Sequence, residues 1–270
     1  MTGRAFRYLF LGAGAAVSIY PFVWMLATSL KALREASLYP LALVPEQWQW
    51  HNYADTLDAA PFATYFFNTF LTAIAVTLAV LLTSISAGYA FARLEFPFKA
   101  TLFAILLATM MIPFEVVLIP NFIAITRLGW YDTSAALIVP WCASAFSIFL
   151  ARQAFLGIPG EYYDAARIDG CGHLRFLARI AVPMARPTLI VIALFAFLGS
   201  YNALLWPLVV TGNESMRVVQ VGLTVFATTD GVRVNLLMCA AVIVIVPTLG
   251  LYFLAQRYFF DASIGAGLKG

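Results

Sequence analysis

The stretch Phe66–Phe91, with the sequence FFNTFLTAIAVTLAVLLTSISAGYAF, contains no charged side chain from its first residue to its last. A helix that crosses the hydrocarbon core of a bilayer needs about 20 mostly apolar residues. Because lipid offers no hydrogen-bond partners, a spanning segment must satisfy its backbone groups internally, as a helix does. The stretch is therefore predicted to be a transmembrane helix, and it decides the class of the whole chain.

Five further stretches have the same apolar character. They are, approximately, Leu9–Ser29, Ala100–Phe122, Ser134–Phe149, Thr188–Val210 and Leu236–Phe253. Pro113 and Pro247 lie inside the third and the sixth span. Neighbouring groups can satisfy the carbonyl that a proline frees, so both prolines predict kinks rather than helix ends. The sequence predicts an all-α polytopic membrane protein with six transmembrane helices, in which residues 1–270 form a single domain.

The composition excludes a water-soluble protein. Of the 270 residues, 63% are hydrophobic and 11% are charged, whereas a soluble domain has about 25% charged residues. The three cysteines have neither the spacing of a disulfide framework nor that of metal ligands, so no metal site is expected. The chain also lacks the Gly-x4-Gly-Lys-Ser/Thr phosphate loop and any recognisable catalytic constellation. It is not expected to be an enzyme, to hydrolyse ATP or to hold a cofactor.

Lysine and arginine are divided unevenly between the two sides of the predicted membrane. Of the sixteen, eleven lie in the two tails and in the loops after the second and fourth spans, and five lie on the other side. Positively charged loops remain in the cytoplasm, so both termini are expected to be cytoplasmic. This distribution accounts for the net charge of +3 without a nucleic-acid partner.

One cytoplasmic loop, about residues 155–187, is too long and too patterned to be a simple connector. Pro159 and Gly160 break the preceding helix, Gly170 is the residue type expected in a left-handed helix cap, and Pro183 is expected to end a second helix. By helical spacing, the second helix carries an apolar and a basic stripe. The stripes consist of Leu174, Leu177, Ala178 and Ala181, and of Arg175 and Arg179. The loop is predicted to be an amphipathic helix–turn–helix at the inner face of the membrane.

Within this loop, one run of residues has a distinctive spacing. Asp164-Ala165-Ala166 is followed after three residues by Gly170, after nine more by Ile180, and after one more by Val182-Pro183. The run resembles the EAA loop of ABC importer permeases, whose pattern is Glu-Ala-Ala, three residues, Gly, nine residues, Ile, one residue, Leu-Pro. The departures are Asp164 for Glu and Val182 for Leu, and both keep the charge or the apolar character.

The resemblance extends along nearly the whole chain. Matching segments are Ser29-Leu30-Lys31, Asn52-Tyr53, Phe67-Asn68-Thr69, residues 87–97, Ile112-Pro113-Phe114-Glu115, Ile119-Pro120, Tyr201-Asn202 and residues 205–208. The glycine-rich end, Gly265–Gly270, is similar to the terminus of maltose-type sugar permeases, a subfamily that also serves glycerol 3-phosphate. Many relatives carry an acidic residue where this chain has Ala203, so no substrate role is transferred to that position.

The resemblance implies a transporter with several subunits in the bacterial inner membrane. Two permease chains form the pathway, two cytoplasmic ATPase subunits bind and hydrolyse ATP, and an extracytoplasmic solute-binding protein delivers the substrate. The loop is expected to dock on an ATPase subunit. Its candidate coupling residues are Asp164, Ala165, Ala166, Arg167, Asp169, Gly170, Ile180 and Pro183. The alternative is a hairpin on the membrane surface, with Arg175 and Arg179 at anionic lipid headgroups.

Three residues are candidates for the substrate pathway. Asn202 has an amide that both donates and accepts, as sugar hydroxyls require, although an interhelical hydrogen bond is an equal alternative. Tyr201 is its neighbour, and Glu115 is the one ionisable residue in a predicted span, in the pathway or at the outer interface. The expected function is carbohydrate import by an ABC importer. The alternatives are import of glycerol 3-phosphate, a self-sufficient carrier, and a membrane scaffold.

Overall fold

A computed structural model describes residues 2–37, 43–228 and 231–267, and the last residues of the glycine-rich terminus, Leu268-Lys269-Gly270, lie outside these ranges. Over the described residues, the regular secondary structure is helical apart from one short antiparallel strand pair, in which Ala227 lies opposite Val232. The chain divides into two compact units. The first comprises Met1–Ala63 and Val219–Leu249, and the second comprises Thr64–Val218 and Gly250–Gly270.

The first unit contains the N-terminal part of the chain and the later segment Val219–Leu249, which includes the strand pair. Its elements are α1 (Thr2–Ser29), α2 (Leu33–Ser37), α3 (Asn52–Asp58), α14 (Val219–Gly222), η4 (Leu223–Phe226), β1 (Ala227–Thr228), β2 (Gly231–Val232) and the first part of α15 (Val234–Gly267). α1 carries exposed apolar side chains along most of its length, as expected of a helix that faces lipid.

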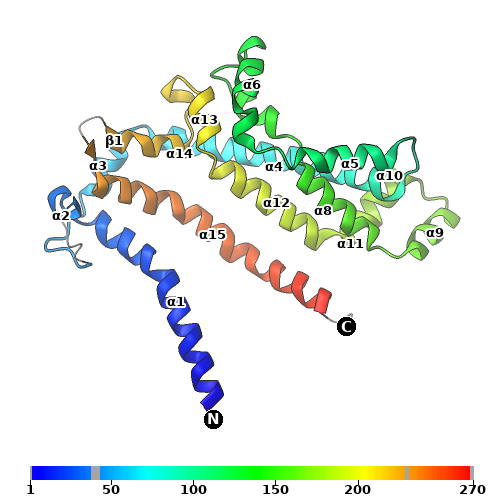
Figure 1. The fold of residues 1–270 in the computed structure, drawn as a ribbon, viewed down its shortest axis with the longest axis horizontal. Coiled ribbons are helices and arrows are strands. Elements are labelled where there is room, and N and C mark those ends of the chain that lie inside the picture. The colour runs from blue at the N-terminus through cyan, green and yellow to red at the C-terminus, as the bar shows by residue number, and fades with distance from the viewer. Residues whose placement is uncertain (1, 38–42, 229–230, 268–270) are drawn as a thin grey trace. The chain divides into compact units, whose positions relative to one another are not determined.

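The second unit is built along α4 (Phe62–Arg93), whose first two residues belong to the first unit. The helices that follow are α5 (Lys99–Thr109), α6 (Phe114–Arg127), α7 (Ser134–Ile138), η1 (Val139–Trp141), α8 (Ala145–Leu156), α9 (Gly160–Ile168), α10 (His173–Phe176), η2 (Leu177–Ala181), α11 (Val182–Met184), α12 (Arg186–Tyr201), α13 (Leu205–Val210) and η3 (Glu214–Met216). Figure 1 shows α9 and α10 at the end of this unit that lies away from α6 and α13.

Several helices have the length and composition of membrane spans. Within the described ranges, Phe6–Ser29, Phe62–Arg93 and Val234–Phe253 each qualify alone, and three bent helix pairs raise the number to as many as six. The prediction of several apolar spanning helices is confirmed. Pro247 lies inside the continuous helix α15, so the expectation that it does not end a helix also holds.

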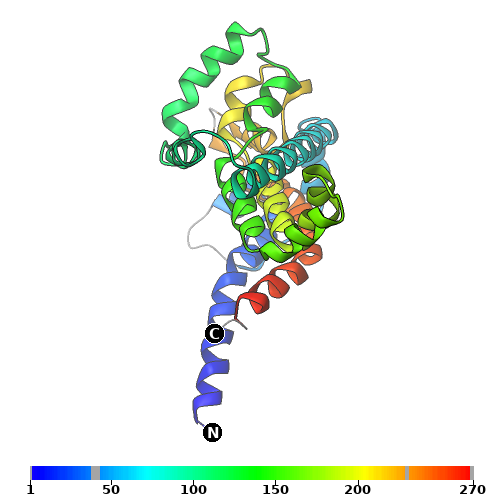
Figure 2. The same ribbon diagram turned by 90° about the vertical axis from the view of Figure 1, so that its right-hand side faces the viewer.

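The expectation for Pro113 is wrong. α5 ends at Thr109, α6 begins at Phe114, and the two helices meet at 98° (Figure 2). Pro113 occupies the N-cap of α6 with an extended backbone, ψ 141°. A proline has no N–H to donate, so it fits immediately before a helix at lower cost than inside one. The third span is thus broken rather than kinked.

The fifth predicted span is interrupted as well. α12 ends at Tyr201 and α13 begins at Leu205, so residues 202–204 separate two helices. Before α12, the helical segment His173–Met184 meets Arg186–Tyr201 at an angle of 82°. Hydropathy detects the apolar character of such a segment, but it does not detect a change in direction.

In the first unit, the segments Ser29-Leu30-Lys31 and Asn52-Tyr53, two of those that resemble the family, meet in a buried polar network. Asn52 Nδ2 donates to the carbonyl oxygens of Ser29, at 2.9 Å, and of Lys31, at 2.8 Å. Its own carbonyl accepts from Asn235 Nδ2 at 3.4 Å, and the hydroxyls of Tyr53 and Ser29 lie 2.9 Å apart. Burial raises the pKa of Tyr53 above its ordinary value. The network satisfies carbonyls at the end of α1, which have no partner inside the helix.

In the second unit, α4 and α8 approach each other at Gly88. A Cβ placed on Gly88 would lie 2.7 Å from Ala151 Cβ and 3.0 Å from Arg152 N, so only glycine fits without movement. Small residues at such a crossing allow two helix backbones to pack closely. Beyond the crossing, at the C-terminal end of α4, Arg93 donates to the carbonyl oxygens of Phe155, at 3.0 Å, and of Ile158. These hydrogen bonds join the C-terminal ends of α4 and α8.

A carboxylate fastens two loops at the other end of this unit. Asp132 Oδ1 accepts from the backbone N–H of Gly212 at 2.8 Å and of Asn213 at 3.1 Å, and Oδ2 accepts from the Asn213 amide. Burial raises the pKa of Asp132, but these hydrogen bonds, first those from Asn213 and Gly212, and the charge of Arg217 lower it by more. The net pKa therefore lies below the ordinary value.

The lowered pKa of Asp132 predicts a loss of stability in acid. The stabilisation is complete above the unfolded-state pKa of about 3.9 and disappears as the pH falls through the lower folded-state pKa. We expect the melting temperature to fall less between pH 5 and pH 3 for Asp132→Asn than for the natural chain. An identical pH dependence in the two proteins would show that this carboxylate does not hold the loops together.

Candidate functional site

The loop between α8 and α12 folds as a helix–turn–helix. α9 begins after Pro159, whose extended backbone occupies the N-cap, and it ends at Ile168. Gly170 has φ +70°, the left-handed conformation expected for it. The predicted turn is therefore confirmed in its position and in its backbone geometry.

The turn at Gly170 has the hydrogen bonds of a Schellman motif. Cys171 N–H donates to the carbonyl of Ala166 at 2.8 Å, and Gly170 N–H donates to the carbonyl of Arg167 at 3.0 Å. These two bonds satisfy carbonyls at the end of α9 and reverse the chain. No atom lies within 4 Å of a Cβ built on Gly170, so the outside of the turn is open.

Aromatic rings hold the loop against the spans. The Tyr163 ring packs edge-to-face on Phe176 with centroids 5.1 Å apart, and Tyr89 of α4 contacts Phe176 and Phe155. His173 lies between the two tyrosines, with Nδ1 3.1 Å from the Tyr89 hydroxyl and Nε2 3.3 Å from the Tyr163 hydroxyl. Phe176 is 1% exposed, so the inner face of the loop belongs to the core of the second unit.

The two alanines of the motif differ in their exposure. Ala166 is buried and packs in the core, whereas Ala165 is exposed. The other candidate coupling residues are mainly on the outer side: Asp164, Arg167, Asp169, Gly170 and Pro183 are exposed, and Ile180 is half-buried. The Arg167 guanidinium lies 5.9 Å from the Tyr163 ring centroid. A partner that binds this loop would therefore meet Ala165 but not Ala166.

The predicted apolar stripe of the second helix is only partly correct. Ala181 is buried and Leu177 is half-buried, but Ala178 is exposed and Leu174 is 83% exposed. Phe176 takes the inward position, and residues two apart on a helix differ in direction by about 200°, so Leu174 points outward. Ile168 at the end of α9 is 87% exposed. We call Ile168 and Leu174 the apolar pair.

Pro183 does not end the second helix, contrary to expectation. Residues 177–181 are π-helical, helix α11 continues through Pro183 to Met184, and the chain turns at Ala185. A π-helical turn widens the hydrogen-bond pattern, which makes room for a proline ring that would otherwise clash with the preceding turn.

The three candidate pathway residues do not form one site. Tyr201 is 1% exposed and packs against Phe70 and Phe197 with centroids 5.8 Å apart in both contacts. Asn202 caps the end of α12, and its Nδ2 donates to the Leu198 carbonyl at 3.0 Å. Glu115 is exposed in the first turn of α6, where a carboxylate is favoured by the helix dipole.

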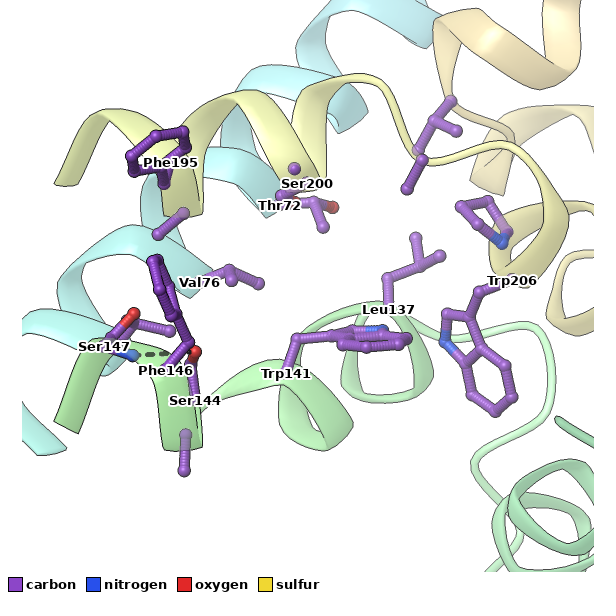
Figure 3. Close-up of a pocket in the computed structure, with 17 residues that line it drawn as sticks. Thr72, Val76, Leu137, Trp141, Ser144, Phe146, Ser147, Phe195, Ser200 and Trp206 are labelled. Atoms are coloured by element: carbon purple, nitrogen blue, oxygen red, sulfur yellow. Dashed lines mark hydrogen bonds between the residues drawn. The ribbon is translucent and has the colours of Figure 1, made fainter. Parts of the chain in front are cut away.

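A cavity of about 330 Å³ lies between α4, α8 and α12, and its lining includes Ser200 and Ala203, which flank Tyr201 and Asn202 in the sequence (Figure 3). Of its 17 lining residues, nine are aliphatic, glycine or proline, and eight carry an aromatic ring or a hydroxyl group: Trp141, Phe146, Phe195 and Trp206, and Thr72, Ser144, Ser147 and Ser200. Serine and threonine at helical spacing are common in any span, so the sequence carries no signal that singles out these residues. Over the described residues, no group of three or more His, Cys, Asp or Glu side chains has the arrangement of a metal site.

The broken apolar helices and the helix–turn–helix on their surface define a class, the transmembrane permease subunits of solute transporters. The chain belongs to the family described as binding-protein-dependent transport system inner membrane component, whose model matches residues 79–261. The predicted family, the helical membrane fold, the transport rather than enzymatic role and the inner-membrane location are confirmed.

Two relatives illustrate this membership, and one solved structure shows a similar fold. The chain is 32% identical over 266 residues to the sn-glycerol-3-phosphate transport system permease protein UgpE of Rhizobium meliloti, covering 95% of this chain and 94% of that protein. It is 31% identical over 259 residues to the arabinooligosaccharides transport system permease protein AraQ of Halalkalibacterium halodurans, covering 95% and 93%. Its fold is similar to a chain of a bacterial ABC transporter involved in the import of the acidic polysaccharide alginate, with a TM-score of 0.84, 22% identity, and 96% and 98% of the chains covered.

Proposed function

We propose that residues 1–270 form one six-span permease domain that supplies half of the translocation pathway of an ATP-driven carbohydrate importer. A second permease chain supplies the other half, two ATPase subunits bind at the cytoplasmic face, and an extracytoplasmic binding protein delivers the substrate. Both termini lie in the cytoplasm. The family and the name of the arabinooligosaccharide relative support this proposal, and the glycerol 3-phosphate relative supports that solute as the second candidate.

Coupling runs through the loop of residues 155–187. The observation that carries this step is the contrast between its two faces: the inner face is fixed by Phe176 and Tyr163, and the outer face presents the apolar pair beside an open turn. Large apolar side chains that are exposed outside the membrane spans become buried when a partner protein covers them, which favours a contact at this place. A force applied to the outer face by an ATPase subunit would reach α4 and α8 through the aromatic contacts of Tyr89.

The replacement Leu174→Glu tests this coupling. The side chain is 83% exposed, so the chain should fold normally, but a charge in the centre of the contact should weaken ATPase binding. A central contact residue contributes about 2 kcal/mol or more, which corresponds to about 30-fold in affinity. The measurement is the affinity of the ATPase subunit for the permease pair in detergent.

The matched control is Leu128→Glu, which makes the same replacement at a 59% exposed leucine outside the loop. We expect its ATPase affinity to equal that of the natural chain. If the Leu174→Glu variant also binds the ATPase subunit with the affinity of the natural chain, the apolar pair is not part of the contact.

A further inference from the structure

The cavity beside α12 has walls suited to an uncharged ring. Its volume of about 330 Å³ lies in the range of small-molecule sites. All the residues that line it belong to the second unit, so its form depends only on that unit.

Two pairs of aromatic rings form opposite ends of the cavity (Figure 3). Trp141 meets Trp206 edge-to-face, with centroids 6.2 Å apart and planes at 79°. Trp206 is fixed, since it is 3% exposed and its Nε1–H donates to the Ala136 carbonyl at 2.9 Å. Phe146 and Phe195 make a second edge-to-face pair at 6.2 Å. Rigid aromatic faces are the surfaces on which the C–H faces of a sugar ring pack, at little cost in conformational entropy.

Hydroxyl groups lie across the cavity from Trp141. Figure 3 shows Thr72 and Ser200 on one side of the space and the Trp141 ring on the other. Two other threonines of α4, Thr69 and Thr77, each donate their hydroxyl to a backbone carbonyl at 2.6 Å. Among the described residues, the hydroxyls of Thr72 and Ser200 form no such bond. Their donors and acceptors remain available to a ligand that carries hydroxyls.

The cavity contains no charge to pair with a phosphate. None of its 17 lining side chains is ionisable as a cation, and recognition of a phosphate ordinarily requires arginine or lysine. Ser144 is the N-cap of α8, and this helix N-terminus is the one feature of the cavity lining that favours an anion. There, the N–H of Ser147 already donates to Ser144 Oγ at 3.2 Å.

We propose that this cavity is a binding subsite for an uncharged sugar ring on the transport pathway. The proposal rests on the proposed function and deepens it, because it assigns a neutral carbohydrate rather than glycerol 3-phosphate as the substrate class. Trp141 provides the packing surface, and Thr72 and Ser200 provide the hydrogen-bonding groups.

Thiol protection in the purified assembled transporter tests the subsite. Ser200→Cys is introduced with Cys142→Ser and Cys171→Ser, while Cys239 is buried and is retained. The rate of reaction with N-ethylmaleimide is followed by mass spectrometry of the peptide that contains position 200. The probes are glucose, xylose, arabinose, maltose and sn-glycerol 3-phosphate, each added in excess. The control is Ser215→Cys, the same replacement at an exposed serine that does not line the cavity.

We expect at least one neutral sugar to slow labelling at position 200 by about tenfold, because a ligand at ten times its Kd leaves about one site in ten free. Labelling at position 215 should not change, and glycerol 3-phosphate should not protect either position. Protection by none of the sugars, protection by glycerol 3-phosphate, or failure of Ser200→Cys to react while Ser215→Cys reacts would each overturn the proposal. Labelling reports ligand binding in this chain and involves no ATP hydrolysis, so a failure of the subsite and a failure of the coupling proposal are distinguishable.

A second variant fills the cavity. No atom lies within 4 Å of a Cβ built on Gly199, which lines the space. Gly199→Leu should therefore abolish protection by the sugar that protects the natural cavity, while assembly with the partner subunits is retained. Full protection in this variant would place the sugar elsewhere.

Discussion

Replacing Gly170 with aspartate is expected to reduce transport about 100-fold while the chain still folds and inserts. The left-handed conformation at φ +70° costs a non-glycine residue about 1 kcal/mol, and aspartate is among the residues that tolerate it best. Nothing within the chain obstructs the new side chain. An ATPase subunit docked on this turn would meet the new carboxylate at position 170 next to that of Asp169. A loss of about 3 kcal/mol in docking free energy corresponds to about 100-fold in affinity.

Gly129 supplies an unusually close control. It also follows a helix, has φ +72° and has no atom within 4 Å of a built Cβ, but it lies in the loop between α6 and α7. Gly129→Asp should therefore transport at the natural rate. Gly170→Asn separates bulk from charge, and we expect it to retain more transport than Gly170→Asp. Equal activity of Gly170→Asp and Gly129→Asp would remove the turn from the docking surface.

The second large effect is expected at Gly88, where the cause is packing inside the chain. Gly88→Leu places a side chain where even a Cβ would lie 2.7 Å from Ala151 Cβ and 3.0 Å from a backbone nitrogen. α4 and α8 would have to separate, and overpacking of this kind costs about 3 kcal/mol. Folded protein should then fall severalfold or more in abundance.

Size-exclusion chromatography of the solubilised chain measures this loss as the area of the monodisperse peak. The control is Gly250→Leu in α15, where a Cβ would meet nothing within 4 Å, and we expect its peak to match that of the natural chain. An unchanged peak for Gly88→Leu would mean that the two helices do not cross at this glycine.

The sequence is most informative where one residue type determines the local structure. The length of Phe66–Phe91 requires a span, and α4 runs from Phe62 to Arg93. The glycine in the spacing pattern requires a reversal, and Gly170 adopts the left-handed cap. Both predictions depend on local physical chemistry, since lipid enforces the helix and only glycine adopts φ +70° without a penalty.

The sequence is less informative where tertiary contacts determine the end of a helix or the exposure of a side chain. A proline such as Pro113 can kink a helix or precede one. Here α6 begins at Phe114, whose ring contacts Trp141 and Trp206, and these contacts are not visible in the local sequence. The motif names Ala165 and Ala166 alike, but the inner face of the loop is set by Phe176 packed on Tyr89 of α4, and only Ala166 lies in that core. One aromatic wall of the cavity combines Trp141 and Trp206, which lie 65 positions apart in the chain and which no local pattern connects.

The proposal that this chain is coupled to an ATPase is tested most directly by its natural partners. The tagged chain is purified from its own membrane in a gentle detergent, and the proteins that accompany it are identified by mass spectrometry. We expect a second multi-span permease in an amount comparable to the chain itself, and ATP-binding-cassette ATPase subunits that total about two per chain. A chain that purifies alone and moves solute in liposomes without ATP would contradict the proposal, because it would be a self-sufficient carrier.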